Sequence, residues 1–439
     1  MAANPPDSRP TLRRALGRWD LTGVGVNQVI GSGVFLLPAS LAAQVAGWSW
    51  VAVALVALLA MLIALNFAEA GSRFDGTGGA FLYTRAAFGR FPSFQVGWML
   101  WVTRATSWAA VVNGLADALG YYWEGALGGF TRTAIISTVI LTIMVLNIRG
   151  IKQTSIVVNT FTIAKVTPLL IFIVVGLPYV SSAALVPGPV PEWTGISTAA
   201  LLLIFGFGGY EAVPVPAGEA TDPKKAVPFA MISTISIVAV VTLMVQVVAL
   251  GTFPGLAGST TPLADAAPLF LGAFGGFLLT AGAAISMTGN NVGQALSGSR
   301  NLYALGEQGD LPEWFGRIHR RFRTPHVAIA VTCLVSLWLA LSGDFVTLAA
   351  ASAVTRLIVY AGTCASVLVL RRRGRAPFTI PGGPAVPVIA LVISGAILFN
   401  ATAVQLTVGL YAILVGAGLY LIARVVDRRA RPGGDRERA

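Results

Sequence analysis

The sequence predicts an all-α integral membrane protein with twelve transmembrane helices. The chain is 55% hydrophobic and only 11% charged, and its mean hydropathy is +0.76. Such a composition is typical of proteins that cross a membrane several times. Apolar segments long enough to span a bilayer recur along the whole chain, and glycines interrupt two of them, one in each half.

These spans leave short polar tails at the two ends of the chain. We expect the spans at 20–45, 47–71, 91–118, 132–148, 152–177, 197–218, 227–251, 270–298, 326–342, 345–369, 386–403 and 407–425. Residues 18–425 then form a single membrane domain, and 1–17 and 426–439 are the tails. Most connecting segments are short, but 299–323 is long and basic. It predicts either a helix along the membrane surface or a solvated connector.

The basic residues indicate which way the chain crosses the membrane. The formal net charge is +12, and every lysine and arginine except Arg104, Arg132, Lys165 and Arg356 lies in a terminus or in a loop on one side. Because lysines and arginines near span ends are retained inside the cell, we expect both termini in the cytoplasm. The charge therefore reports topology in a cytoplasmic (inner) membrane, and no nucleic-acid partner is expected. The excess of arginine over lysine is typical of GC-rich bacterial genomes.

The two interrupted spans are the first and the sixth. The first contains IGSGVF at 30–35, and the sixth contains FGFGGYE at 205–211. Irregular backbone at membrane depth survives only where it lines a cavity or meets a ligand. Spans one and six also cross in opposite directions, which is the geometry of a five-plus-five inverted repeat, 18–177 and 197–369, followed by two extra helices within 386–425.

Both breaks expose backbone groups that suit an α-amino acid. Free N–H groups at the start of a half-helix attract a carboxylate, and freed carbonyls attract an ammonium group. The expected substrate-binding residues are Val29, Ile30, Gly31, Ser32, Gly33, Val34, Phe205, Gly206 and Phe207. Phe205, beside the second break, is the expected gate. The alternative is that the small residues form a seam where helices pack closely.

Ionisable side chains within the spans are costly and mark functional positions. We expect Lys165 and Glu211 to couple transport to protons, with H⁺ as the coupling ion and with no other cofactor. Snorkelling to an interface is the alternative for Lys165, and a structural ion pair is the alternative for Glu211. No cluster of metal-ligating or catalytic side chains is visible in the sequence, so no metal site and no enzyme activity are expected.

Arg104 and Arg356 also lie within spans and need acidic partners. The candidates are Asp117, Glu211 and Glu69, and the sequence does not choose among them. An arginine that faces the cavity could instead bind a carboxylate of the substrate.

Several motifs together resemble the amino acid–polyamine–organocation transporters over nearly the whole chain. They are IGSGVF at 30–35, GGAFLY at 78–83, NIRG at 147–150, FGGYE at 207–211, SRNLYA at 299–304 and GDLP at 309–312. The resemblance implies the leucine-transporter fold and alternating access. It also implies that Lys165 occupies a sodium site of sodium-dependent relatives and donates to a first-helix carbonyl, here that of Gly31.

The expected function is therefore sodium-independent, proton-coupled transport of amino acids or amines across the cytoplasmic membrane. One alternative is an obligate exchanger of amino acids, amines or polyamines. Another is a membrane sensor or accessory subunit that does not transport. The sequence leaves the substrate side chain and the oligomeric state open.

Overall fold

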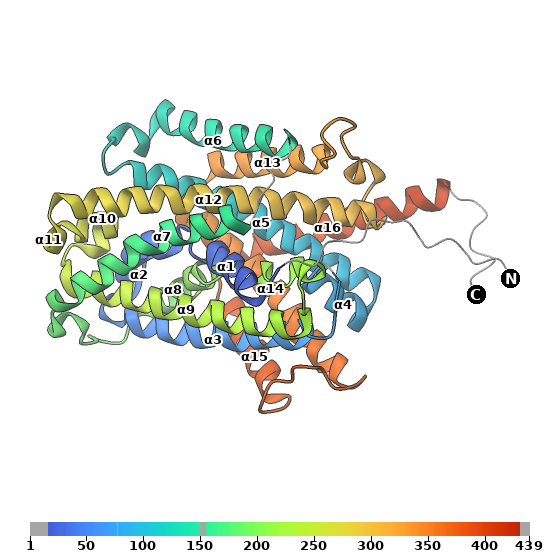
Figure 1. Cartoon of the computed structure of the whole chain (residues 1–439), viewed down its shortest axis with the longest axis horizontal. Helices are drawn as coiled ribbons and strands as arrows, with labels where there is room; N and C mark the ends of the chain where they lie inside the picture. The colour runs from blue at the N-terminus through green and yellow to red at the C-terminus, as the bar shows by residue number, and fades with distance from the viewer. Residues whose placement is uncertain (1–15, 77, 150–154, 431–439) are drawn as a thin grey trace.

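The described part of the protein is a bundle of helices (Figure 1). The structure, a computed structural model, describes residues 16–76, 78–149 and 155–430. Most of both expected tails, and Gly150 of the NIRG motif, lie outside these residues. Within them no strand forms, and one isolated bridge joins Leu16 to Ala220.

The first expected span is two helices joined by irregular backbone. α1 (Arg18–Val29) ends where Ile30 becomes extended, with φ −73° and ψ 90°. α2 (Gly33–Val45) begins three residues later, after a bend at 30–32. A Cβ at Gly31 would lie 2.9 Å from the Asn290 Nδ2 atom, so a larger residue there would displace this side-chain amide.

The sixth expected span also breaks, but its second part is not an α-helix. α8 (Trp193–Gly206) is followed by a turn and then by two 3₁₀ helices, η5 (Tyr210–Ala212) and η6 (Val215–Glu219). Gly209 has φ +129°, a conformation that suits glycine. Pro214 and Pro216 lack the N–H that an α-helix would need. The expected span at 197–218 corresponds to the apolar segment Trp193–Glu219, whose part beyond the break is 3₁₀ rather than α-helical.

The remaining elements include one long helix at most of the other expected spans and several short helices between them. They are η1 (Ala46–Trp48), α3 (Ser49–Gly71), α4 (Ala80–Phe88), α5 (Arg90–Leu119), η2 (Glu124–Leu127), α6 (Gly129–Arg149), α7 (Ser155–Gly176), η3 (Leu177–Tyr179), η4 (Ser182–Leu185), α9 (Pro223–Thr252), η7 (Leu256–Gly258), α10 (Pro262–Ala266), α11 (Pro268–Leu271), α12 (Ala273–Glu307), η8 (Glu313–Gly316), α13 (His326–Ser342), α14 (Phe345–Arg371), α15 (Ala385–Phe399) and α16 (Ala403–Ala430). The connector at 299–323 is not a separate surface helix, because α12 continues to Glu307 and only η8 follows it.

Seven segments of the described chain are long and apolar enough to cross a membrane, so this is a multi-pass membrane protein. They are Gly33–Gly71, Gly129–Arg149, Phe161–Tyr179, Trp193–Glu219, Pro223–Thr252, Phe345–Arg371 and Ala403–Val425. α5 and α12 are long but more polar. They pack against each other over much of their length (Figure 1), and most side chains of α5 are buried there.

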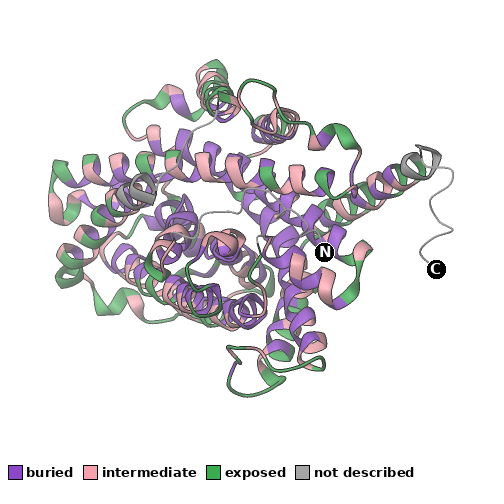
Figure 2. Ribbon diagram, turned by 45° about the vertical axis from the view of Figure 1, so that its right-hand side comes forward, coloured by how far each residue is buried: buried purple, intermediate pink, exposed green. Residues whose placement is uncertain are grey.

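The helices form two packed groups. α1, α2, α3, α8 and α9 pack on one another, and α5 packs on α12, α13 and α14. Side chains where the groups meet are buried, whereas the outer faces of peripheral helices are exposed (Figure 2). Both broken segments belong to the first group, and they contact the second group through α5, α12 and α14.

Candidate functional site

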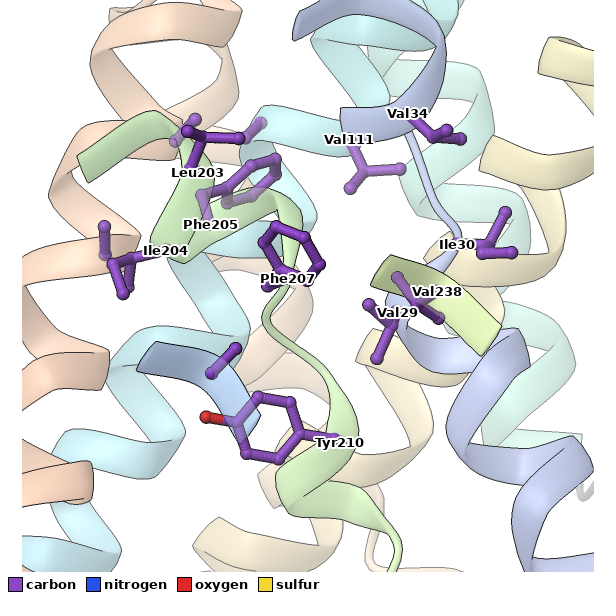
Figure 3. Close-up of a cluster of buried hydrophobic side chains, with 14 of the residues drawn as sticks. Val29, Ile30, Val34, Val111, Leu203, Ile204, Phe205, Phe207, Tyr210 and Val238 are labelled. Atoms are coloured by element: carbon purple, nitrogen blue, oxygen red, sulfur yellow. The ribbon is translucent and has the colours of Figure 1, made fainter. Parts of the chain in front are cut away.

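The two broken segments touch each other through their backbones. A Cβ at Gly33 would lie 2.9 Å from the Gly206 Cα atom, and a Cβ at Gly209 would lie 2.5 Å from the Gln28 carbonyl oxygen. Figure 3 shows Phe205, Phe207 and Tyr210 following one another along the second break, opposite Val29 and Ile30 at the end of α1. Glycine therefore permits a backbone approach that any side chain would prevent.

Ser32 and the start of α2 present polar groups at this meeting point. The Ser32 hydroxyl is buried and has no hydrogen-bond partner among the described residues. The first backbone N–H groups of an α-helix lack a partner four residues earlier, so the N–H groups of Gly33 and Val34 are available for a ligand. This arrangement of donors can bind a carboxylate.

Lys165 binds backbone carbonyls at the end of α1, where the first break begins. Its buried ammonium group donates to the carbonyl oxygens of Asn27, at 3.0 Å, and Ile30, at 2.9 Å. A third contact, 3.5 Å long, reaches the Ser286 carbonyl. A lysine ammonium has three N–H donors, so these carbonyls use all of them. Lys165 thus ties α7 to α1 deep inside the protein and does not snorkel.

The carbonyl expected to accept from Lys165 was that of Gly31, and this was wrong by one residue. The Gly31 carbonyl instead accepts from the Ser286 hydroxyl at 3.1 Å, and the same hydroxyl reaches the Ile30 carbonyl at 3.1 Å. Ser286 was missed by the sequence analysis. Serine is common in α12, and nothing in the sequence shows which one faces the break.

Glu211 lies between two arginines immediately after the second break. Its Oε1 atom is 3.0 Å from Arg356 Nη1 and 3.4 Å from Arg104 Nη2. Its Oε2 atom accepts from the Gly209 N–H at 2.9 Å and from the Tyr360 hydroxyl at 3.2 Å. We call Arg104, Glu211 and Arg356 the arginine–glutamate cluster. All three side chains are buried.

A chain of side-chain amides connects this cluster to the first break. Arg104 donates to Gln294 Oε1 at 3.3 Å, and Gln294 donates to Asn290 Oδ1 at 3.3 Å. Asn290 then donates to the Gln28 carbonyl at 2.9 Å. The cluster and the end of α1 are therefore parts of one buried polar network.

The other two acidic candidates pair elsewhere. Asp117, expected as a possible partner of the intramembrane arginines, instead lies 2.6 Å from Arg132. Together they line a hollow of about 480 Å³ at the end of α5. Glu69 accepts from Arg371 at 2.6 Å. Glu211 is thus the carboxylate that Arg104 and Arg356 share.

Both phenylalanines of the second break are buried. Phe207 is 1% exposed, and Phe205 is 7% exposed and packs edge to face on Phe345, with ring centroids 5.8 Å apart. Val29, Ile30 and Val34 also point into the apolar interior (Figure 3). At these positions the groups available for polar recognition are therefore in the backbone. Within the described residues, no group of acidic, histidine or cysteine side chains could hold a metal ion.

Comparison with known proteins agrees with this architecture. The chain is 27% identical to the methylthioribose transporter of Bacillus subtilis, with 87% of each chain covered. It is 27% identical to that organism's branched-chain amino acid permease, covering 94% of this chain and 93% of the relative. It is 26% identical to the serine/threonine exchanger of the same organism, covering 87% and 89%.

The amino acid permease family model matches residues 16–419, which include both broken segments, Lys165 and the arginine–glutamate cluster. Relatives and family are transporters rather than enzymes. The chain belongs to the amino acid permease family.

Proposed function

We propose that this protein is a secondary active transporter that binds an amino acid between the two broken segments. The observation that most strongly supports this is their backbone contact at Gly33 and Gly206. The α-carboxylate would accept from the N–H groups at the start of α2. The α-ammonium would bind carbonyls freed at the end of α8, because the last carbonyls of a helix lack intrahelical partners.

The proposed architecture has twelve spans, an inverted repeat of the leucine-transporter type and both termini in the cytoplasm. Transport would proceed as the group containing α1, α3, α8 and α9 moves against the group containing α5, α12 and α14. Phe205 would cover the bound substrate as a gate, since it lies between the second break and α14.

Proton coupling is assigned first to Lys165. Its ammonium would take the place of a sodium ion, and its hydrogen-bond acceptors are carbonyls rather than a carboxylate. Loss of its proton would weaken its hydrogen bonds to the Asn27 and Ile30 carbonyls. Helix α1 would then be freer to move against α7. Glu211 is less suited to this role, because protonating it would leave two buried guanidinium groups without a counter-ion.

Uptake into proteoliposomes tests this proposal. A panel of labelled amino acids and amines is offered in sodium-free buffer, with and without an inward proton gradient. We expect the gradient to drive accumulation in wild type and Lys165→Ala to abolish that response. Lys224→Ala is the matched control, because Lys224 is 49% exposed and pairs with Asp75 at the surface.

Full proton-driven accumulation by Lys165→Ala would refute the role of this lysine. Uptake that needs unlabelled substrate inside the vesicles would identify an obligate exchanger; one relative is named a serine/threonine exchanger. Ligand-induced thermal stabilisation without flux would indicate a sensor or accessory subunit.

A further inference from the structure

The arginine–glutamate cluster contains one more positive than negative charge. Glu211 is the carboxylate in contact with Arg104 and Arg356 among the described residues. The other buried carboxylates of the described chain, Glu69 and Asp310, pair with arginines outside the cluster. An uncompensated cation in a protein interior is costly. The cluster is therefore electrostatically incomplete without an additional anion.

The cluster also has unused hydrogen-bond donors. The Nε atoms of Arg104 and Arg356 are buried and have no hydrogen-bond partner among the described residues. Both arginines are about 1% exposed, so bulk water does not satisfy them. A guanidinium group has five N–H donors arranged to bind a carboxylate through two of them at once.

Arg356 lies against the second break, and Arg104 is linked to the first break by hydrogen bonds. A Cβ on Gly208 would fall 1.5 Å from Arg356 Nη1, so this guanidinium rests directly on the second break. Arg104 reaches the first break through the amide chain that ends on the Gln28 carbonyl. The side chain of an amino acid bound at the two breaks therefore has a positively charged surface within reach.

We propose that Arg104 and Arg356 receive a second carboxylate of the substrate, and that the transporter prefers acidic amino acids. A substrate with net charge −1 balances the cluster, a zwitterion leaves its charge unchanged, and a cationic substrate adds to it. The order of affinity is then acidic, neutral, basic. This inference rests on the proposed function and adds the substrate class to it.

Matched pairs of substrates test the preference without any mutation. Binding of aspartate against asparagine, and of glutamate against glutamine, is measured on the purified full-length protein in lipid nanodiscs. Within each pair the size is nearly equal and the charge differs. We expect at least one acid to bind about tenfold or more tightly than its amide, because a unit charge a few ångströms away inside a protein is worth at least that much.

Replacing chloride by gluconate distinguishes a substrate carboxylate from an inorganic anion. If chloride alone completes the cluster, it will strengthen binding of acid and amide equally, with no preference between them. That result would overturn the proposal. A preference for the acid that persists in gluconate supports it.

A variant then tests whether the preference for the acid over its amide comes from the arginine–glutamate cluster. Arg104→Gln leaves the closer pair, Glu211 with Arg356, electrically balanced. We expect it to bring acid and amide affinities to within about twofold. Arg424→Gln is the control, because Arg424 bonds Tyr420 on α16, away from the breaks, and it should keep the preference.

Equal binding of acid and amide by wild type, or a preference retained in Arg104→Gln, would refute the inference. If neutral amino acids are still transported in that case, the proposed function stands and only the substrate class is wrong. If none of the amino acids binds or is transported, both fail.

Discussion

Gly208→Ala should destabilise the protein through a single clash. The new Cβ would lie 1.5 Å from Arg356 Nη1, 2.1 Å from its Cζ and 2.6 Å from its Nε. The guanidinium must therefore move away, which breaks its 3.0 Å ion pair with Glu211 and its 2.9 Å hydrogen bond to Ser107. Gly208 does not have a positive φ, so the effect comes from the clash rather than from backbone strain.

The size of the effect follows from the buried pair. Removing one partner of a buried ion pair costs about 3–5 kcal/mol of folding free energy. Arg104 keeps its 3.4 Å contact with Glu211, so we expect about 3 kcal/mol, the lower end of that range. Gly395→Ala is the matched control, because it lies within α15 with open space around it. Alanine there should be neutral or stabilising by up to about 1 kcal/mol.

Thermal unfolding of the purified variants measures the difference, and a double-mutant cycle assigns its cause. Arg356→Ala removes the atoms that the new Cβ would meet, so adding it to Gly208→Ala should cost much less than the sum of the two single changes. Wild-type stability of Gly208→Ala, or additive effects of the two mutations, would show that Arg356 does not rest on this glycine.

Three further changes test other contacts. Glu211→Gln leaves two buried arginines without a counter-ion, so thermal unfolding should show a loss of about 3–5 kcal/mol; unchanged stability would mean that water or an anion already screens them. Gly33→Ala puts a Cβ 2.9 Å from the Gly206 Cα atom, so proteoliposome uptake should fall several-fold, and normal uptake would show that the backbones need not meet. Glu69→Gln weakens the pair with Arg371 and should lower the unfolding midpoint, with transport per folded molecule unchanged.

The two interruptions could be predicted because their cause is local. A glycine pair within an apolar run weakens a helix whatever surrounds it, and the hydropathy of 30–35 and 205–211 places both breaks within spans. The two 3₁₀ helices after the second break have a local cause as well. The two prolines at 214 and 216 are visible in the sequence.

The partners of the buried polar groups could not be predicted, because they come from distant parts of the chain. Ser286 reaches carbonyls 255 and 256 residues away. Tyr360 donates to Glu211 across 149 residues. No spacing rule connects such positions, so the sequence offered three acidic partners for Arg104 and Arg356 with no means of choosing. Only the folded arrangement, which brings Glu211 of η5 to Arg104 of α5 and Arg356 of α14, makes Glu211 the partner.

Both buried ionic centres lie where the two groups of helices meet, and this suggests how they work together. Lys165 on α7 donates to a carbonyl at the end of α1. Arg104 on α5 and Arg356 on α14 pair with the Glu211 carboxylate, just after the turn that follows α8. Each centre therefore ties one broken segment to a helix beside it. The amide chain from Arg104 to the Gln28 carbonyl joins the centres at the end of α1. A substrate carboxylate that binds the unused donors of Arg104 and Arg356 would change the charge beside the second break, and loss of the Lys165 proton would weaken the hydrogen bonds at the first. If transport is coupled as proposed, both events must favour the same movement, and one network that touches both breaks would connect them.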